Sequence, residues 1–444
     1  MKKILLILND NPIDPLGAMY LIGNVNANFD VTFIKDQYDK RLDSINIFKY
    51  DILGFSTITG SHLMHNEIAK RFKNKNSNIL TLMGGPHPTF FPKKALELSH
   101  IDYICIGEGT IALDKFVKGE KTNNIINTYK KYTGILDPVQ DINKMKIERD
   151  IIYKIDNRGK NTIKNFMGTF GCPYNCTYCF NYAYHNIYKH QNIKRVRYVN
   201  PRILIDDMKY CTQNYLTKFI YIQDDIFIMN KKWFIEVSNL IKKEINLPYH
   251  CHVRVDIITE EIIQQLKKTN CKSVTFSIEN GSEEYRKKYL NRRMTNQKIL
   301  ETAKLLHKYN IEFRIENMVG LPFNTLKDNL ATLEINYKCH PTIGWASLFQ
   351  PFTNTVLSDL IIKKGLWSGN IDDINSGFFD KSPLKIKNKI QIERLQKIFS
   401  IAVDNKMIKL LTPLLIYLPL DNFYKNLYIK FKEKKYDKLY SFEL

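Results

Sequence analysis

The chain of 444 residues is long for a single hydrophobic core, so two or three domains are expected. Its 44% hydrophobic and 12% aromatic residues exclude a disordered protein. The initial segment MKKILLILNDNP shows no cleavage-site pattern, and the apolar run at 410–420 is too short to span a bilayer. Five of the eight cysteines are scattered, mostly in apolar runs, as expected of free buried thiols. These features predict a cytoplasmic protein.

The formal net charge of +21 raises the question of a nucleic-acid partner. Lysines are spread over the predicted helices and no RNA-binding module is recognisable, so we interpret the charge as compositional and assign no nucleic-acid partner. The densest basic segment, residues 424–438, directly follows the apolar run at 410–420. It favours a solvated terminal helix, with contact to a membrane surface as the alternative.

Residues 1–118 alternate short apolar runs with helical patterns, which predicts a Rossmann-like, doubly wound parallel sheet. Strands are expected at 2–8, 30–34, 51–56, 78–85 and 103–107, and helices at 16–25 and 61–73. Ligands of such sheets bind at the carboxyl ends of the strands. The small residues at three of these ends favour a large planar ligand, although any one group could serve only a tight turn.

A second strand–helix alternation follows residues 119–160, which we predict to be a linker. Within 161–355 there are six strand candidates, at 165–170, 218–224, 249–256, 273–279, 312–320 and 344–350. Six units are too few to close an eight-stranded barrel, so a partial (β/α)6 barrel is expected. Residues 356–444 are expected to form a small, mostly helical domain, with an amphipathic helix at 392–403.

Three further cysteines are gathered in one stretch, GCPYNCTYCF, at residues 171–180. Cys172, Cys176 and Cys179 follow the first strand of the second domain, where active sites of such barrels collect. Three thiolates can hold zinc or an iron–sulfur cluster. Zinc would need a fourth ligand, for which His185 and His190 are candidates. A cluster with three cysteines leaves one iron open, and the polar residues at later strand ends favour this second interpretation.

The spacing Cys-x3-Cys-x2-Cys followed by an aromatic residue, Phe180, resembles the signature of the radical S-adenosylmethionine (radical SAM) family. The resemblance implies a [4Fe–4S] cluster whose open iron binds the amino and carboxylate groups of SAM. It further implies cleavage of SAM to methionine and a 5′-deoxyadenosyl radical that abstracts hydrogen from the substrate. An external electron donor of the flavodoxin or ferredoxin type is implied as well.

Later segments resemble the SAM-binding motifs of the same family. Phe180 matches the position that borders the adenine, and Gln223, Asp224 and Asp225 replace the frequent Gly-Gly-Glu strand end. One aspartate would receive the SAM ammonium, but which one stays open because neighbours on a strand point oppositely. Arg254 is a candidate for the SAM carboxylate, with pairing to a nearby acid such as Asp256 as the alternative.

Two further segments extend the resemblance. SIENGSEE resembles a ribose-binding segment in which Glu279 would accept the ribose hydroxyls. NMVGLPFNT resembles a stretch that borders the adenine at Gly320 and Leu321. Phe323 and Asn324 stand where that stretch usually has Gly and Glu, so the sequence departs from the family pattern at these two positions.

The segments STITG, GGPHPT and GEGT resemble the cobalamin-binding domain of radical SAM enzymes. The first loop, NDNPIDPLGAMY, lacks the histidine of the Asp-x-His-x-x-Gly pattern, so the lower face of cobalt is expected to lack a histidine ligand. A histidine flanked by two prolines in a later turn is interpreted as a shape or hydrogen-bonding residue. The cobalamin-binding residues implied by the resemblance are Leu16, Gly17, Ser56, Thr57, Gly84, Gly85, Pro86, His87, Gly107, Glu108 and Gly109.

These resemblances favour a cobalamin-dependent radical SAM methyltransferase that acts on an unactivated carbon or phosphorus centre. The same cofactors in a rearrangement, ring contraction or cyclisation are the first alternative. A zinc-stabilised, basic RNA-binding protein is the second. The substrate is expected to be a small molecule, lipid or peptide, and the sequence assigns no catalytic residue on the substrate side.

Overall fold

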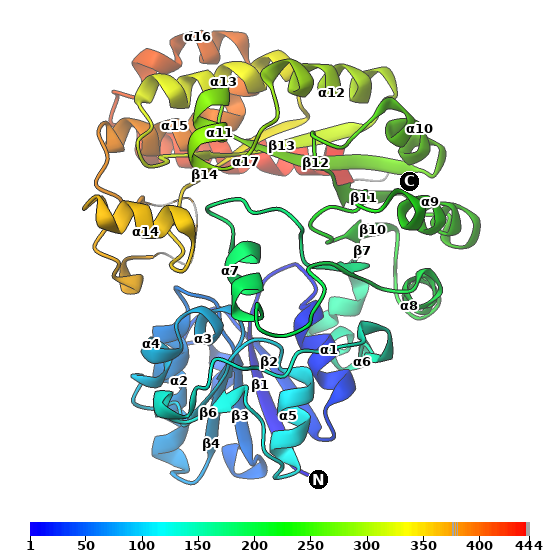
Figure 1. The fold of residues 1–444 in the computed structure, drawn as a ribbon, viewed down its shortest axis with the longest axis vertical. Coiled ribbons are helices and arrows are strands. Elements are labelled where there is room, and N and C mark those ends of the chain that lie inside the picture. The colour runs from blue at the N-terminus through cyan, green and yellow to red at the C-terminus, as the bar shows by residue number, and fades with distance from the viewer. Residues whose placement is uncertain (375–376, 378, 380, 441–444) are drawn as a thin grey trace. The chain divides into compact units, whose positions relative to one another are not determined.

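The structure is a computed structural model that describes residues 1–374, 377, 379 and 381–440, with 432–434, 436–438 and 440 described by their backbone only. Its packing divides the chain into two compact units. Unit 1 comprises Met1–Asn165 and Ala183–Val199, and unit 2 comprises Phe166–Tyr182 and the chain from Asn200 onward. Each unit is built on a six-stranded sheet (Figure 1). The division into four segments drawn from the sequence stays a prediction.

The sheet of unit 1 has the order β2-β1-β3-β4-β5-β6, so the strand order reverses beside β1. Its first five strands pair in parallel, and β6 is antiparallel to β5. This arrangement confirms the doubly wound, Rossmann-like sheet. The strands are β1 (Lys3–Asn9), β2 (Asn28–Ile34), β3 (Ile52–Ser56), β4 (Leu80–Gly84), β5 (Tyr103–Cys105) and β6 (Ile125–Ile126).

Helices cover both faces of this sheet (Figure 1). They are α1 (Leu16–Asn24), α2 (His62–Lys75), α3 (Pro86–Phe90), α4 (Pro92–Leu96) and α5 (Thr110–Val117). Residues 119–160, the predicted linker, contain β6, α6 (Asp150–Tyr153) and the 3-10 turns Tyr129–Lys131, Ile142–Lys144 and Ile155–Lys160, and they pack in unit 1. Further 3-10 turns lie at Lys40–Leu42 and Ile47–Lys49, and β9 (Arg197–Tyr198) closes the unit.

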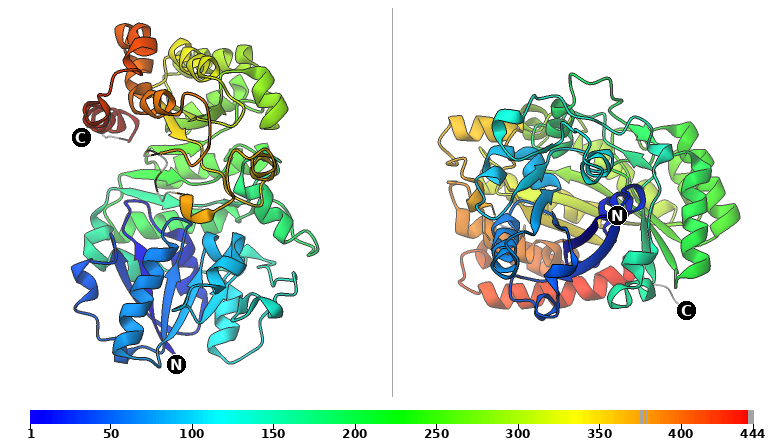
Figure 2. Two further views of the ribbon diagram at one scale, coloured as in Figure 1. Left: turned by 90° about the vertical axis from the view of Figure 1, so that its left-hand side faces the viewer. Right: turned by 90° about the horizontal axis from the view of Figure 1, so that it is seen from below.

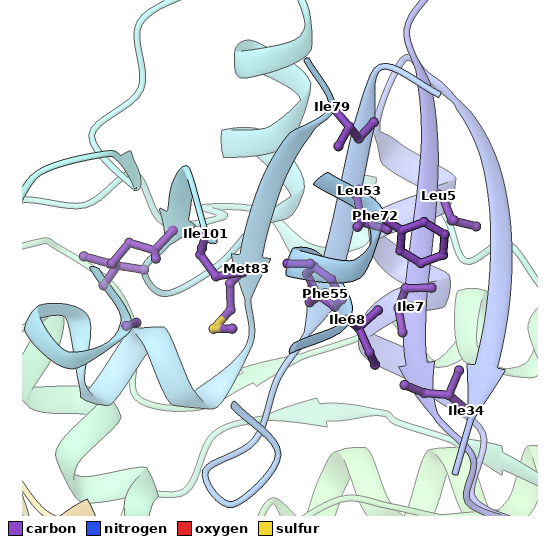
Figure 3. Close-up of a cluster of buried hydrophobic side chains, with 14 of the residues drawn as sticks. Leu5, Ile7, Ile34, Leu53, Phe55, Ile68, Phe72, Ile79, Met83 and Ile101 are labelled. Atoms are coloured by element: carbon purple, nitrogen blue, oxygen red, sulfur yellow. The ribbon is translucent and has the colours of Figure 1, made fainter. Parts of the chain in front are cut away.

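The two faces of this sheet are filled differently. Leu5 and Ile7 of β1 point to the α2 side, where they join Phe55, Ile68 and Phe72 in a closely packed apolar cluster (Figure 3). Because side chains alternate along a strand, the intervening residues point to the opposite face, beneath α1 and α5. That face contains a cavity, described below.

The sheet of unit 2 has the order β14-β13-β12-β11-β10-β7, and the pairs from β10 to β14 are parallel. Six strands leave the sheet open, which confirms the partial barrel. The strands are β7 (Ile163–Phe166), β10 (Phe219–Ile222), β11 (Tyr249–His252), β12 (Cys271–Glu279), β13 (Glu312–Val319) and β14 (Ile343–Leu348), with the short β8 (Thr169–Phe170) after β7.

Helices alternate with these strands, as the sequence predicts. They are α7 (Phe180–Ile187), α8 (Pro201–Asn214), α9 (Lys231–Leu240) with a π-helical extension at Ile241–Ile245, α10 (Glu260–Lys268), α11 (Glu283–Tyr289), α12 (Asn296–Lys308), α13 (Leu326–Cys339) and α14 (Val356–Lys363).

The C-terminal segment is helical, as expected. After a 3-10 turn at Ile371–Asp373 it forms α15 (Lys389–Asp404), α16 (Lys406–Leu415) and α17 (Asp421–Tyr440). The apolar face of α15 packs on β13 and β14 through Leu395 and Phe399. In Figure 2, α16 and α17 are the orange and red helices at the margin of unit 2. None of the helices formed by the described residues is long and apolar enough to cross a bilayer.

Candidate cofactor sites

The three-cysteine loop connects β8 to α7 in unit 2. Cys176 is buried, and Cys172 and Cys179 are partly exposed. Burial raises the pKa of Cys172 to about 11 and that of Cys179 to about 12. Both thiols are therefore protonated at neutral pH without a metal, and metal binding must release these protons.

Arg254, which follows β11, contacts this loop directly. Its Nη1 donates to Cys176 Sγ at 3.8 Å, and its guanidinium lies 3.7 Å from the centre of the Tyr174 ring. Its Nε donates to Asp256 Oδ2 at 2.8 Å, so the pairing considered from the sequence as the alternative is present. Arg254 is buried, and its positive charge lies beside the thiols while Asp256 neutralises it.

Glu279 ends β12 at an irregularity in the strand register, with a φ of 66°. Its Oε1 accepts from Tyr178 Oη at 2.7 Å and from Arg292 Nη1 at 3.4 Å. Tyr178 lies between the second and third cysteines, so this contact joins the cysteine loop to the end of β12. Burial raises the pKa of Glu279, although Arg292 and Tyr178 favour the charged carboxylate.

The two aspartates after β10 have different surroundings. Asp224 is buried, and its Oδ1 accepts from the backbone N–H groups of Gly168 at 2.6 Å and Thr169 at 3.1 Å. Its Oδ2 is buried without a hydrogen-bond partner, and burial raises its pKa to about 7. Asp225 is exposed and accepts from Asn181 Nδ2 at 3.0 Å. The Gln223 backbone N–H donates to the Phe166 carbonyl at 2.8 Å.

The segment after β13 is held by internal contacts. Gly320 has a φ of 73°, and its N–H donates to Asn329 Oδ1 at 3.0 Å. Leu321 is buried, whereas Phe180 after the cysteine loop is half exposed. Asn324 Oδ1 accepts from Asn280 Nδ2 at 2.9 Å, but its own Nδ2 is buried without a partner. This donor stands where the resembling motif usually has a carboxylate.

Apart from Phe180, which begins α7, the predicted SAM-binding residues follow or end β10, β11, β12 and β13, at the edge that the cysteine loop also contacts. Contacts are shown for Asp225, Arg254 and Glu279 with the loop or its flanking helix. Sequence reasoning missed Tyr178, Arg292 and Asn181. The position of Tyr178 inside the cysteine motif was a usable signal, whereas nothing local marks the other two.

The cysteine loop supplies three thiols, the donor set of a cluster with one open iron. Among the described residues, no three histidine, cysteine or carboxylate side chains are gathered closely enough to hold one metal ion. A tetrahedral zinc site needs four ligands around one atom, whereas a cubane distributes its thiolates over separate irons and needs them more widely spaced. Three thiols from one short loop, with a guanidinium beside them, suit the second geometry.

Unit 1 contains a cavity of about 270 Å³ on the face of its sheet beneath α1 and α5. Its floor is apolar, with Ile4, Leu6, Ile52 and Leu82 from the strands and Leu113 from α5. Its upper wall consists largely of small residues at strand and helix ends. Seven of the predicted cobalamin-binding residues line it, namely Gly17, Ser56, Gly84, Gly85, Pro86, Gly107 and Gly109.

Two of these glycines are required by their backbone. Gly85 has a φ of 95°, and a Cβ there would lie 2.9 Å from the backbone of Thr57. Gly107 has a φ of 75°, and a Cβ there would clash with Tyr188 Oη. Gly17 differs, since a Cβ there would meet nothing within 4 Å. Gly85 and Gly107 are therefore required by the packing of the cavity wall on Thr57 and Tyr188, whereas the space beside Gly17 is open.

The remaining four predicted residues lie outside this cavity. Leu16 is buried, Thr57 Oγ1 bonds His65 Nδ1 at 2.8 Å, and Glu108 forms an ion pair with Arg197. His87 is buried, stacks on His62 with ring centres 4.1 Å apart and bonds Thr59 Oγ1 through Nδ1 at 3.2 Å.

His87 keeps one nitrogen without a hydrogen-bond partner, namely the buried Nε2. Burial lowers its pKa to about 3, so the ring is neutral at physiological pH.

The fold and these two sites define a class of protein. It combines a Rossmann-like unit, which has a cavity lined partly by glycines, with a partial barrel whose first loop carries three cysteines. Comparison with family models agrees. Residues 167–335 match the radical SAM superfamily, and residues 3–117 match the B12-binding domain. The chain therefore carries a radical SAM domain and a B12-binding domain, and the cofactors of these domains are a [4Fe–4S] cluster, SAM and cobalamin.

Several known proteins are similar over most of the chain. The uncharacterized methyltransferase PH0819 of Pyrococcus horikoshii is 26% identical over 79% of this chain and 79% of its own length. The anaerobic magnesium-protoporphyrin IX monomethyl ester cyclase of Rubrivivax gelatinosus is 24% identical over 73% of this chain and 61% of its own. The solved structure of the cobalamin-dependent S-adenosylmethionine radical enzyme OxsB, with aqua-cobalamin and SAM bound, superposes with a TM-score of 0.69 at 15% identity. That superposition covers 99% of this chain and 72% of that one.

Proposed function

We propose that this protein is a cobalamin-dependent radical SAM methyltransferase that methylates an unactivated carbon or phosphorus centre. The observation that carries the proposal is the presence in one chain of a three-cysteine loop at a barrel mouth and a glycine-lined cavity in a Rossmann-like sheet. When bound, the cluster and SAM supply a radical that removes hydrogen, and cobalamin supplies a carrier for a methyl group. Similarity to a methyltransferase supports the direction of the chemistry.

Cys172, Cys176 and Cys179 would hold the cluster through their sulfurs. Arg254, 3.8 Å from Cys176 Sγ, would stabilise the negative charge of the ligated thiolates and help release their protons. The aromatic ring of Tyr174 beneath the guanidinium fixes its position. Three cysteine ligands would leave the fourth iron of a bound cluster open for SAM.

SAM would lie along the carboxyl ends of β10 to β13. Asp225 is the better candidate for the SAM ammonium, because it is exposed, whereas Asp224 is buried on backbone N–H groups. Glu279 would accept the ribose hydroxyls, while Gly320, Leu321 and the half-exposed Phe180 would border the adenine, with Gln223 beside the aspartates.

Cobalamin would use the cavity of unit 1. A cavity of about 150 Å³ holds one benzene ring in another protein, so 270 Å³ is room for an aromatic base with part of its sugar. The apolar floor would suit the aromatic nucleotide base of cobalamin. His87 and Glu108, with Leu16 and Thr57, would then support the cavity wall through their internal contacts.

The test is anaerobic reconstitution with iron, sulfide and cobalamin, followed by incubation with SAM and a reductant. Formation of both S-adenosylhomocysteine and 5′-deoxyadenosine supports methyl transfer combined with radical chemistry. The Cys176→Ala variant is expected to lose most of its iron and sulfide, whereas Cys251→Ala, a buried thiol outside the loop, is the matched control and keeps them. Iron retention by Cys176→Ala, or 5′-deoxyadenosine without S-adenosylhomocysteine, would contradict the proposal.

Similarity to a ring-forming cyclase supports a second candidate, a radical SAM cobalamin enzyme whose product carries no new methyl group. Methyl-labelled SAM distinguishes the two candidates, because only a methyltransferase moves the label into the product. A rearrangement or ring contraction has the same signature as cyclisation in this assay. Stoichiometric zinc in colourless protein would instead favour the RNA-binding alternative.

The remaining partners belong to this proposal as well. The substrate would be a small molecule, lipid or peptide, and a flavodoxin or ferredoxin would deliver the electron. A cytoplasmic location suits an oxygen-sensitive cluster in a reducing compartment.

A further inference from the structure

Helix α16 presents an apolar face to solvent. Met407, Leu410, Leu411 and Leu414 follow the spacing i, i+3, i+4, i+7, which places them on one side of the helix. They are 64%, 57%, 44% and 69% exposed. Together with Leu418 and Phe423 in and after the following turn, 45% and 59% exposed, they form what we call the α16 patch.

Helix α16 also has a separate core-facing side. The opposite side of α16 carries Ile408, Leu415 and the neighbouring Ile416, which pack into the cluster formed with α15 and β14. Tyr424 Oη also donates to the Leu415 carbonyl at 2.9 Å, which holds α17 against α16. The helix is therefore fixed in place with a second apolar face outside the core, where monomeric proteins rarely expose large contiguous apolar patches.

The charge around the α16 patch is positive. Residues 404–431 contain four lysines and two aspartates. Asp404 forms an ion pair with Lys435, and Asp421 accepts from Arg394 and Lys397, so partners compensate both acids. Lys406, Lys425 and Lys430 are exposed beside the apolar side chains.

We propose that the α16 patch docks on an anionic lipid surface. Apolar side chains flanked by lysines match an acyl boundary covered by negative head groups, and Tyr417 and Phe423 supply the amphipathic or aromatic rings that settle at such an interface. Ten helical residues extend about 15 Å, half of a hydrocarbon core, so α16 lies on the bilayer. The proposal does not depend on cofactor binding or on the reaction.

The test is cosedimentation of the full chain with two kinds of vesicle. One is phosphatidylcholine alone, and the other is phosphatidylcholine and phosphatidylglycerol in equal parts. Binding is expected to the anionic vesicles and to weaken with added salt. The Leu410→Ser/Leu414→Ser variant is expected to reduce partition at least about tenfold, because each leucine leaves water on insertion. Replacing Lys406 and Lys425 with Gln is expected to weaken binding to the anionic vesicles selectively.

The matched control is Ile203→Ser/Leu216→Ser, which removes two exposed apolar side chains in and after α8 and should bind as the wild type does. Far-ultraviolet circular dichroism confirms that each variant is folded. The proposal is overturned if the wild-type protein does not bind anionic vesicles or if the Leu410→Ser/Leu414→Ser variant binds them as well as the wild type does. It is also overturned if that variant only abolishes self-association in analytical ultracentrifugation, which would assign the patch to a second copy of the chain.

Discussion

Filling the cavity of unit 1 should separate stability from cobalamin binding. Gly17 lies in α1 and lines the cavity, and a Cβ at this position would enter open space. Gly17→Leu replaces glycine, a poor helix former, and this gain in helix propensity should stabilise the protein by about 0.8–1 kcal/mol. Burying the leucine side chain adds at most about 1.5–3 kcal/mol, less about 0.5–1 kcal/mol of lost rotamer entropy. The cofactor-free protein should therefore become more stable.

Cobalamin binding should change in the opposite direction. A leucine in a 270 Å³ cavity leaves too little room for an aromatic base and its sugar. Losing the apolar contacts of that base costs several kcal/mol, so affinity should fall by more than about a hundredfold. Thermal unfolding of the cofactor-free protein and equilibrium dialysis with cobalamin measure the two effects. Gly17→Ala is the control, since it gains the same helix propensity and leaves the volume of the cavity nearly unchanged.

Two results would refute this reasoning. Wild-type cobalamin affinity in Gly17→Leu would show that the cofactor does not use this cavity. A loss of stability would show that the side chain cannot enter it.

Three more substitutions test the strained backbone and buried charges, each by denaturant unfolding of the cofactor-free protein. Gly107→Ala should cost about 2–5 kcal/mol, because it combines a positive φ with a clash against Tyr188, whereas Gly134→Ala, with a similar φ and open space, should cost only about 1–2 kcal/mol. Equal losses of stability in Gly107→Ala and Gly134→Ala would show that the clash with Tyr188 contributes nothing. Arg292→Met should cost about 3–5 kcal/mol by leaving a buried carboxylate without its cation, and a cost under 1 kcal/mol would count against that pair. Burial raises the pKa of Asp224 to about 7, above its unfolded value, so its ionisation lowers stability as pH rises from about 4 to 7. Relative to wild type, Asp224→Asn should gain stability over that window, by up to about 4 kcal/mol, and a pH-independent difference would contradict the assignment.

Much of the fold could be predicted because the strands are short, apolar and bounded by turns. The run expected at 2–8 forms β1 at Lys3–Asn9, and the run expected at 273–279 lies within β12. Other boundaries differ more: the strand expected at 249–256 ends at His252, and the run expected at 165–170 is divided between β7 and β8. Strand pairing rather than composition decides where a ladder ends. Residues 119–160 have little periodicity, yet they contribute β6 to the first sheet, because two residues suffice to pair at an edge.

The candidate sites could be predicted only in part. The cysteine motif and the small residues at strand ends are local patterns, and the sequence shows them directly. The contacts of Arg254 with Cys176 and of Arg292 with Glu279 depend on how strands and loops are juxtaposed in space, so no spacing rule marks them. The cavity is likewise invisible in sequence, because the volume left beneath α1 and α5 depends on how these helices pack.

Two buried arginines of unit 2 are already paired with carboxylates before any cofactor binds. Arg254 after β11 is neutralised by Asp256, and Arg292 in the loop between α11 and α12 is neutralised by Glu279 at the end of β12. An unpaired buried charge would cost several kcal/mol, so each group needs a partner in the empty protein. On the proposed assignment, SAM brings its own ammonium, carboxylate and hydroxyls, and its binding exchanges one set of polar contacts for another. Affinity for SAM then depends on the difference between two nearly balanced sets, and weakening an internal pair without removing the SAM-contacting member should strengthen binding.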